Sequence, residues 1–337
     1  MTPHKLCVAP MMERTDRHCR YLMRSIAPNA WVYTEMITAP ALLHGDSERF
    51  LRFDPREHPV ALQLGGSDPG QLAAAARLGE AAGYDEVNLN VGCPSPRVKA
   101  GRFGVVLMLE PELVASCVEA MRRAVCVPVT VKCRIGVDDR DDYAFLYEFT
   151  RHVVDAGCTA LFVHARKAWL KGLSPKQNRE VPPLDYSRVH RLIADFPGLE
   201  VVINGGLDTA RTALRELGFV DGIMLGRSAY AEPMLMAELD RRIFAAGVPR
   251  SRADIAESYV AHVESELASG TPLRVMTRHL MGLYAHQPGA RRWRRELGEL
   301  AEGKPGFRAF KRLLAAQRGG SAAPYAKFAF DLVCERD

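Results

Sequence analysis

The chain has 337 residues, of which 47% are hydrophobic and 25% charged. This composition excludes disordered, fibrous and membrane-embedded chains and is typical of a soluble globular protein. The formal charge of +5 is unevenly spread, since residues 1–249 hold 30 basic and 30 acidic side chains whereas residues 250–337 hold 15 and 10. The whole excess of positive charge therefore lies in the last quarter of the chain.

Short apolar runs rich in β-branched residues recur up to residue 225 and predict strands. Helical patterns with start and stop signals separate most of them, and this alternation indicates parallel βαβ units. The predicted strands are 6–11, 31–36, 60–64, 86–90, 129–133, 160–164, 201–204 and 222–225, and the predicted helices between them include 69–82, 111–125, 143–156, 186–195 and 209–217.

Eight continuous apolar runs fit strands buried on both faces, as in a closed barrel. A doubly wound open sheet is the alternative, but no G-x-G-x-x-G follows the first run, as a dinucleotide-binding sheet requires. The predicted fold class is therefore α/β, with a (β/α)8 TIM barrel over residues 1–245 followed by a smaller domain.

That second domain, over residues 250–337, is predicted to be all-α, with helices at 253–268, 272–286, 291–300, 306–317 and 325–334. Residues 273–318 hold 11 basic and 3 acidic side chains, and Arg291 and Arg294 flank Trp293 in the densest part of this cluster. Contact with nucleic-acid phosphates explains such a cluster. A solvated helix face with Trp293 packed inward explains it equally well.

A barrel places its active site at the C-terminal ends of its strands, and polar or Gly-rich residues follow the predicted strands here. The Gly turns after the last two strands are typical of phosphate binding through backbone N–H groups, although they also permit tight turns. Donors and acceptors on Lys132, His164 and Gln63 suit a polar heterocycle such as an isoalloxazine ring. The strand-end residues include Pro10, Met11, Met12, Gln63, Asn90, Lys132, Arg134, His164, Arg166, Asn204, Gly205, Gly206, Gly226 and Arg227.

One of the eight cysteines, Cys93, follows the fourth strand among polar residues. The others include Cys7, Cys126, Cys133 and Cys158, which lie in or beside apolar runs, as buried cysteines without chemistry do. An unperturbed thiol is mostly protonated at pH 7 and can serve as a general acid, whereas a thiolate would be a nucleophile. Cys93 is therefore a candidate for either role.

The cysteines include no C-x-x-C pair, so we expect no metal site. The first apolar run is too short for a signal peptide, and no segment approaches the roughly 20 apolar residues of a membrane span. We therefore expect a cytoplasmic protein with reduced thiols and no membrane partner. We also expect it to be monomeric.

Six short segments carry a resemblance to a known family: 8–11 (VAPM), 63–67 (QLGGS), 88–95 (NLNVGCPS), 131–134 (VKCR), 163–166 (VHAR) and 204–206 (NGG). Together they resemble the tRNA-dihydrouridine synthases, and residues 164–179 are similar to the signature of the bacterial A-type members. The resemblance implies FMN, recharged by NADPH, and reduction of uridine to 5,6-dihydrouridine in the D-loop of tRNA, at positions 20 and 20a. One departure is Val105, where relatives usually have alanine.

The resemblance also implies roles for individual residues. Cys93 would protonate C5 of the uracil while reduced flavin gives hydride to C6, and Asn90 would hold the uracil edge. Lys132 and Arg134 would stabilise the charge that develops on its carbonyl oxygen. The implied FMN contacts are Pro10, Met11, Met12, Gln63, Lys132, His164, Asn204, Gly205, Gly206, Gly226 and Arg227.

A uridine folded inside tRNA must be flipped out to reach such a site, so the protein has to bind the surrounding RNA. Beyond the helical domain, Arg166, Lys176 and Arg179 at the barrel rim are candidates for this contact. Two other hypotheses stay open. One is an FMN-dependent barrel that reduces a free small molecule such as a pyrimidine or an enone, and the other is a tRNA-binding protein without chemistry.

Overall fold

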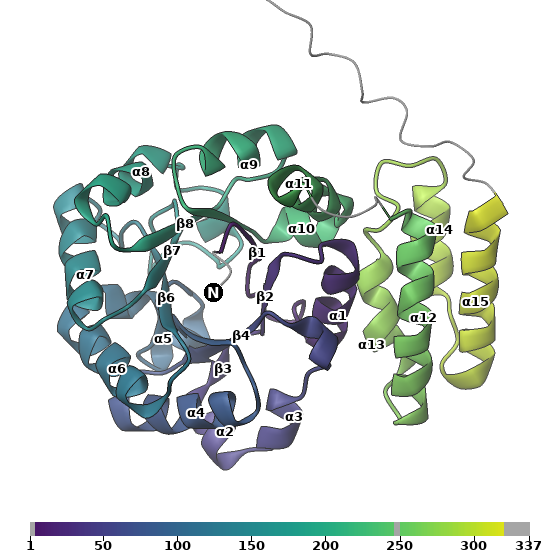
Figure 1. Ribbon diagram of the computed structural model, residues 1–337, viewed down its shortest axis with the longest axis horizontal. Helices are drawn as coiled ribbons and strands as arrows, with labels where there is room; N and C mark the ends of the chain where they lie inside the picture. Colours follow the sequence, from purple (N-terminus) through teal and green to yellow (C-terminus); the bar gives the residue numbers. More distant parts are fainter. Residues whose placement is uncertain (1–3, 246–249, 320–337) are drawn as a thin grey trace, which may run out of the picture. The chain divides into compact units, whose positions relative to one another are not determined.

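The computed structural model describes residues 4–245 and 250–319, and the chain divides into two compact units, Met1–Pro249 and Arg250–Asp337. Within residues 4–245, eight parallel strands pair in a closed ring, in which β9 returns to β1 and β2 pairs with β4 (Figure 1). Helices surround this ring, so the predicted (β/α)8 barrel is confirmed. The predicted helix at 325–334 lies outside the described residues.

The strands are close to those predicted, and three of them, β5, β7 and β9, have the predicted bounds. A two-residue strand, β3, was not predicted; it pairs with β4 beside the ring and is too short to produce a sequence pattern. The strands are β1 (Leu6–Val8), β2 (Trp31–Tyr33), β3 (Ile37–Thr38), β4 (Val60–Gly65), β5 (Glu86–Asn90), β6 (Val129–Arg134), β7 (Ala160–His164), β8 (Glu200–Asn204) and β9 (Gly222–Leu225).

Helices follow strands β4 to β8 in turn, and several begin at a side chain that caps the first turn. Asp68, Asp142 and Asp185 each accept a hydrogen bond from the backbone N–H three residues later. These caps stop each helix from extending back into the strand-end loop that precedes it. The helices of this unit are α1 (Arg17–Ile26), α2 (Ala39–His44), α3 (Ser47–Leu51), α4 (Pro69–Ala81), α5 (Pro96–Ala100), α6 (Pro111–Ala124), α7 (Tyr143–Asp155), α8 (Tyr186–Asp195), α9 (Ala210–Leu217), α10 (Arg227–Ala231) and α11 (Met234–Phe244).

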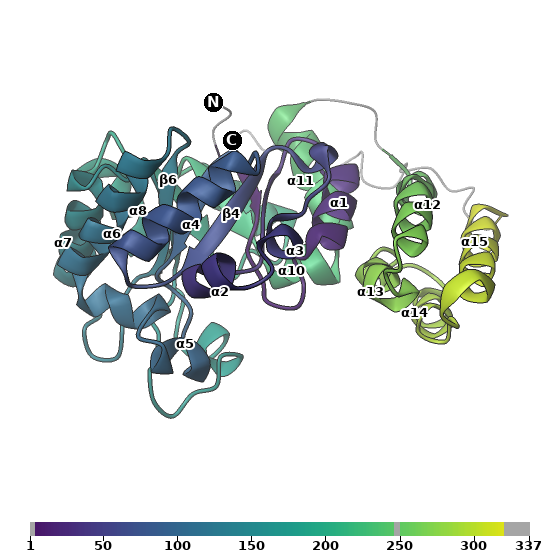
Figure 2. The ribbon, with the colours of Figure 1, turned by 90° about the horizontal axis from the view of Figure 1, so that it is seen from below.

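Within the second unit, the described residues form helices α12 (Arg252–Ala268), α13 (Leu273–Thr277), α14 (Ala290–Gly298) and α15 (Gly303–Gly319) (Figure 2). The prediction of one helix over 272–286 is wrong, because α13 gives way to a 3-10 turn at Arg278–Leu280 and then to turns. Trp293 is buried and donates from Nε1 to the carbonyl of Leu280 at 2.8 Å. That bond fixes α14 against the turn that interrupts the predicted helix.

The barrel interior combines aromatic packing with a buried charged cluster near the start of the strands. His4 donates from Nε2 to Glu86 (2.7 Å) and from Nδ1 to Glu200 (2.9 Å), and its ring packs on those of Trp31 and Phe162. His4 and Glu86 are both almost completely buried. Two carboxylates facing both ring nitrogens favour the doubly protonated imidazolium.

This cluster makes stability depend on pH. Burial alone would lower the pKa of His4, but hydrogen bonds to Glu200 and Glu86 raise it to about 9. This folded-state pKa lies above that of the unfolded chain. The contribution of His4 to the stability of the fold is therefore fully present below about pH 6.5 and is lost as the pH rises through about 9. We expect the free energy of unfolding of the wild type, measured with urea, to fall by about 3 kcal/mol over that pH range. The His4→Gln variant should not show this fall.

Burial and Arg134 lower the pKa of Lys132 to about 8, so Lys132 titrates in both proteins over the same range. The effect of His4 is therefore the difference between the two curves of unfolding free energy against pH. Parallel curves for the wild type and His4→Gln would contradict a charged His4.

Candidate functional site

Three strand-end side chains meet at the mouth of the barrel. Lys132, His164 and Asn204 end or nearly end three adjacent strands, β6, β7 and β8. Lys132 donates from Nζ to Oδ1 of Asn204 at 3.1 Å, and Asn204 donates to the carbonyl of Met224 on β9 at 2.6 Å. Two N–H groups of the Lys132 ammonium remain available for a ligand.

His164 is neutral at this mouth. Burial, followed by the positive charges of Arg134 and Lys132, lowers its pKa well below the usual value. Gly205 lies against the ring, since a Cβ there would lie 2.5 Å from Cδ2 of His164, and its φ of +106° also favours glycine. Tyr186 donates from its hydroxyl to the carbonyl of Gly205 at 2.8 Å and holds this turn in place.

Arginines gather in and around the loop that follows β7. Arg227 donates to Oε1 of Glu180 at 2.5 Å and to the carbonyl of Arg179 at 3.2 Å. Arg166 donates to the carbonyls of Glu180 and Pro182. Within the described residues, the Nε atoms of Arg166 and Arg179 are buried without a hydrogen-bond partner, and burial and Arg227 lower the pKa of both side chains. This rim therefore favours a bound anion.

The loop after β5 holds the cysteine singled out in the sequence. Oδ1 of Asn90 accepts the backbone N–H groups of Gly92 (3.2 Å) and Cys93 (3.0 Å), and the carbonyl of Cys93 accepts the N–H of Val105 (3.1 Å). Cys93 itself is partly exposed, and Val105 is fully buried. Gly104 has no room for a side chain, since a Cβ would lie 2.7 Å from the carbonyl oxygen of Cys93.

Arg134 joins this loop to the loop that follows β7. Its Nε donates to the carbonyl of Gly92 at 2.9 Å, and its Nη1 donates to the carbonyls of Lys167 (3.1 Å) and Asn178 (3.0 Å). The side chain is 2% exposed, and burial lowers its pKa to about 10. The sequence pattern predicted a ligand-facing role for Arg134 and did not indicate Asn178, whose buried amide bonds the backbone N–H and carbonyl of Trp169 within the loop after β7.

Other predicted residues are more peripheral. Pro10 and Met11 are partly buried after β1, whereas Met12 is 56% exposed, and Lys176 is exposed. In the second unit Arg291 and Arg294 are exposed on α14 while Trp293 is buried. The prediction that Cys126 is buried is wrong: it is exposed in the turn between α6 and β6.

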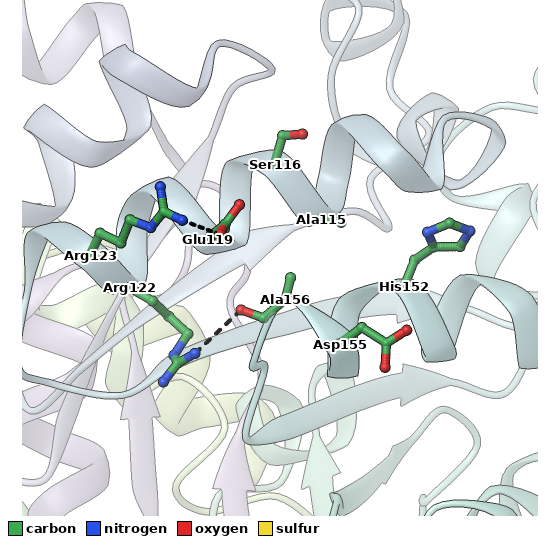
Figure 3. Close-up of a pocket in the computed structure, with 8 residues that line it drawn as sticks. All are labelled: Ala115, Ser116, Glu119, Arg122, Arg123, His152, Asp155 and Ala156. Carbon is green, nitrogen blue, oxygen red and sulfur yellow. Dashed lines mark hydrogen bonds and ion pairs between the residues drawn. The ribbon is translucent and has the colours of Figure 1, made fainter.

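A hollow of about 440 Å³ lies between α6 and α7 on the outside of the barrel (Figure 3). Asp155 and Ala156 in its lining directly precede β7, so the hollow lies toward the end of the barrel opposite the Cys93 loop. Arg122 donates to the carbonyl of Ala156 at 3.4 Å, and Arg123 pairs with Glu119 at 2.5 Å. Asp155 pairs with Arg151 at 3.2 Å and His152 lies 3.8 Å from Glu112, so each charged side chain of the lining already contacts another group of the protein.

Two further properties concern the part of the chain that the structure describes, residues 4–245 and 250–319. It contains no group of three or more His, Cys, Asp or Glu side chains placed to hold a metal ion. It also contains no helix with the length and apolar character needed to cross a membrane.

Comparisons with known proteins place the chain in one family. The family model described as Dihydrouridine synthase (Dus) matches residues 7–315. The tRNA-dihydrouridine(20/20a) synthase of Vibrio cholerae is 52% identical over 304 residues, covering 90% of this chain and 92% of that protein. The protein with the same description in Xanthomonas campestris is 54% identical over 303 residues, covering 90% of each chain.

A solved structure, the old yellow enzyme homologue from Zymomonas mobilis, is similar with a TM-score of 0.54 and 13% identity. The match covers 73% of this chain and 90% of the chain of the Zymomonas mobilis protein. At this identity the likeness shows the fold alone.

We expect Arg134→Lys to loosen the two loops that Arg134 joins. A lysine ammonium cannot span carbonyls on both loops, so the variant should lose about 2–4 kcal/mol of stability. Trypsin should then cleave the native protein several-fold faster after Lys171 and Lys176. Arg151→Lys, on the exposed face of α7, is the control, and equal cleavage rates in the two variants would contradict the joining role.

Proposed function

The chain belongs to the dihydrouridine synthase family, and from this membership we propose that it reduces uridine to 5,6-dihydrouridine at positions 20 and 20a in the D-loop of tRNA. The relatives that share about half of its residues over 90% of its length carry the description tRNA-dihydrouridine(20/20a) synthase. The observation that carries the proposal is that Cys93 lies close enough to Lys132 and Arg134, at the barrel mouth, to interact with them electrostatically.

The residues at the mouth fit FMN. Its phosphate requires positive charge and free donors, and the unpartnered Nε atoms of Arg166 and Arg179 lie beside Arg227 at the rim. The first turn of α10 receives no hydrogen bond from the side chain at its N-cap, since that residue is Gly226. A phosphate would therefore find both arginine and backbone N–H donors.

The ring of the flavin requires a smaller set of donors and acceptors. Lys132 retains two ammonium N–H groups, and neutral His164 can donate from one ring nitrogen and accept at the other. Gln63 also keeps one N–H and one lone pair beyond its internal hydrogen bonds. In the bound state FMN, recharged by NADPH, would supply the hydride that reduces the uracil.

Cys93 is the proposed proton donor to C5 of the uracil. Its backbone is held by Asn90 and Val105 while its side chain remains partly exposed, as an acid that must meet a substrate requires. Arg134 lies close enough to Cys93 to interact with it electrostatically. Its positive charge would favour the negative charge that develops on the thiol and on the uracil carbonyl during the transfer.

The helical unit is the proposed contact for tRNA backbone. Arg291 and Arg294 are exposed, and neither forms an ion pair within residues 250–319, whereas their neighbour Arg292 pairs with Glu296 at 2.5 Å. Trp293 is buried and so does not present its ring to a base. The exposed arginines suit phosphate contacts, which bind without reading sequence.

Replacing the acid tests the chemistry. We expect the wild type to show flavin absorbance bands after loading with FMN and to form dihydrouridine in unmodified tRNA. Cys93→Ala should keep the bands, because no predicted flavin contact is changed, and should lose about 100-fold or more in turnover. Cys126→Ala, at an exposed cysteine between α6 and β6, is the control. Unchanged turnover by Cys93→Ala would refute the acid role, and a wild type that cannot bind FMN would refute the enzyme.

Replacing the exposed arginines tests the RNA contact. For every phosphate that the protein no longer neutralises, the slope of log binding constant against log salt should fall by roughly 0.7–0.9. Arg291→Ala with Arg294→Ala should therefore weaken tRNA binding and flatten that slope by about 1.5. Arg123→Ala with Arg151→Ala, the control, removes two exposed arginines that are already paired with glutamates. An unaltered slope in the first double variant would contradict the phosphate contact.

A further inference from the structure

Beneath the Cys93 loop, the barrel interior contains a continuous row of hydrogen-bonded polar side chains. Asn90 donates from Nδ2 to Oε1 of Gln63, and Gln63 donates from Nε2 to Oδ1 of Asn88, both at 2.8 Å. Asn88 donates from Nδ2 to Oγ1 of Thr130 at 2.8 Å, and Thr130 donates to Oε1 of Glu86 at 2.7 Å. These five side chains, which we call the interior row, are 0–8% exposed.

The upper end of the interior row sets its direction. The backbone N–H groups of Gly92 and Cys93 can only donate, so Asn90 must present its oxygen to them and its amide N–H groups to Gln63. Gln63 then has to accept from Asn90 with its oxygen and donate to Asn88 with its nitrogen. In the same way, Asn88 accepts from Gln63 and donates to Thr130. The hydroxyl of Thr130 is thereby left to donate downward.

The lower end imposes the same direction. The carboxylate of Glu86 can only accept, and it receives hydrogen bonds from Thr130, from the hydroxyl of Tyr33 at 3.0 Å and from Nε2 of His4 at 2.7 Å. His4 is in turn held by Glu200. Every hydrogen bond along the interior row therefore joins a donor to an acceptor, and reversing any one amide would place two donors or two acceptors face to face.

Strand register makes this row possible. Gln63 on β4 is the pairing partner of Asn88 on β5, which is the pairing partner of Thr130 on β6. The three side chains lie on one level of the barrel, one strand apart. Thr130 and Asn88 are at most 1% exposed, so they act on the site only through their neighbours.

We propose that Thr130 and Asn88 are positioning residues: together with Glu86 they hold Asn90 in the one orientation that fixes the backbone of Cys93. This rests on the proposed function in so far as Cys93 is its proton donor. Without the row, the Asn90 amide can rotate, and the loop loses the acceptor that holds two of its N–H groups. Cys93 would then spend less time where a substrate can take its proton.

Thr130→Val tests the row, because valine keeps the shape of threonine and removes the hydroxyl. Thr150→Val is the matched control: Thr150 is equally buried and donates to the carbonyl of Leu146 on the outer helix α7. Thr130→Ser restores the hydroxyl. The first measurement is the rate at which iodoacetamide alkylates Cys93 in the native full-length protein, followed by mass spectrometry of its peptide, with exposed Cys126 as the internal reference.

We expect Thr130→Val to raise the Cys93 alkylation rate about fivefold relative to Cys126, because the loop opens more often. Thr150→Val should leave that ratio unchanged, and Thr130→Ser should return it toward that of the wild type. In the second measurement, on the flavin-loaded enzyme, Thr130→Val should lower kcat for tRNA about tenfold and leave KM within about twofold.

The proposal would be overturned if iodoacetamide alkylated Cys93 no faster in Thr130→Val than in Thr150→Val. It would also be overturned if Thr130→Ser did not return the alkylation rate toward that of the wild type. The alkylation measurement needs neither flavin nor tRNA. A wild type that forms no dihydrouridine would therefore refute the proposed function while leaving the test of the interior row intact.

Discussion

Closure of the barrel excludes water from its interior, and most of the other features of this protein follow from that constraint. Eight strands cannot close around charged groups such as Glu86 and His4 unless those groups are paired, because an unpaired buried charge costs several kcal/mol. The pairing of His4 with two carboxylates satisfies the lower end. It also leaves Glu86 an acceptor for Thr130, so the charge at the barrel floor and the backbone N–H groups at the mouth impose the same orientation on the amides between them.

The charges at the mouth of the barrel are arranged differently. Here like charges are brought together, and burial and mutual repulsion lower the pKa values of Lys132, Arg134 and Arg179. The carbonyl of Gly92 holds Arg134, and the amide oxygen of Asn204 holds Lys132, and neither of these neutral acceptors cancels the positive charge. The protein thus stabilises its floor with complete ion pairs and leaves its rim with excess positive charge, which a phosphate-bearing ligand would relieve.

The sequence was sufficient for features that a local pattern encodes. Continuous apolar runs predicted β5 and β7 with their observed bounds, and the polar strand ends included Lys132, His164 and Asn204, which meet at the mouth. The interior row was not predicted, because Gln63, Asn88 and Thr130 are far apart in sequence and only cross-strand register brings them together. His4 was missed for a similar reason: a single histidine before the first strand carries no signal until closure brings two glutamates to it.

The helical unit shows how one sequence pattern can satisfy two explanations at once. The cluster around Trp293 has the aromatic packed inward and the arginines exposed, so the structural role of Trp293 and the proposed phosphate contact of the arginines belong to different side chains of the same helix. Exposed arginines without an exposed aromatic favour phosphate over base contact. In the proposed reaction this unit would therefore add affinity without base readout. Choice of the target base would rest on the barrel mouth, where Asn90 and Arg134 have most of their hydrogen bonds committed to the protein and only a few donors remain to recognise a uracil.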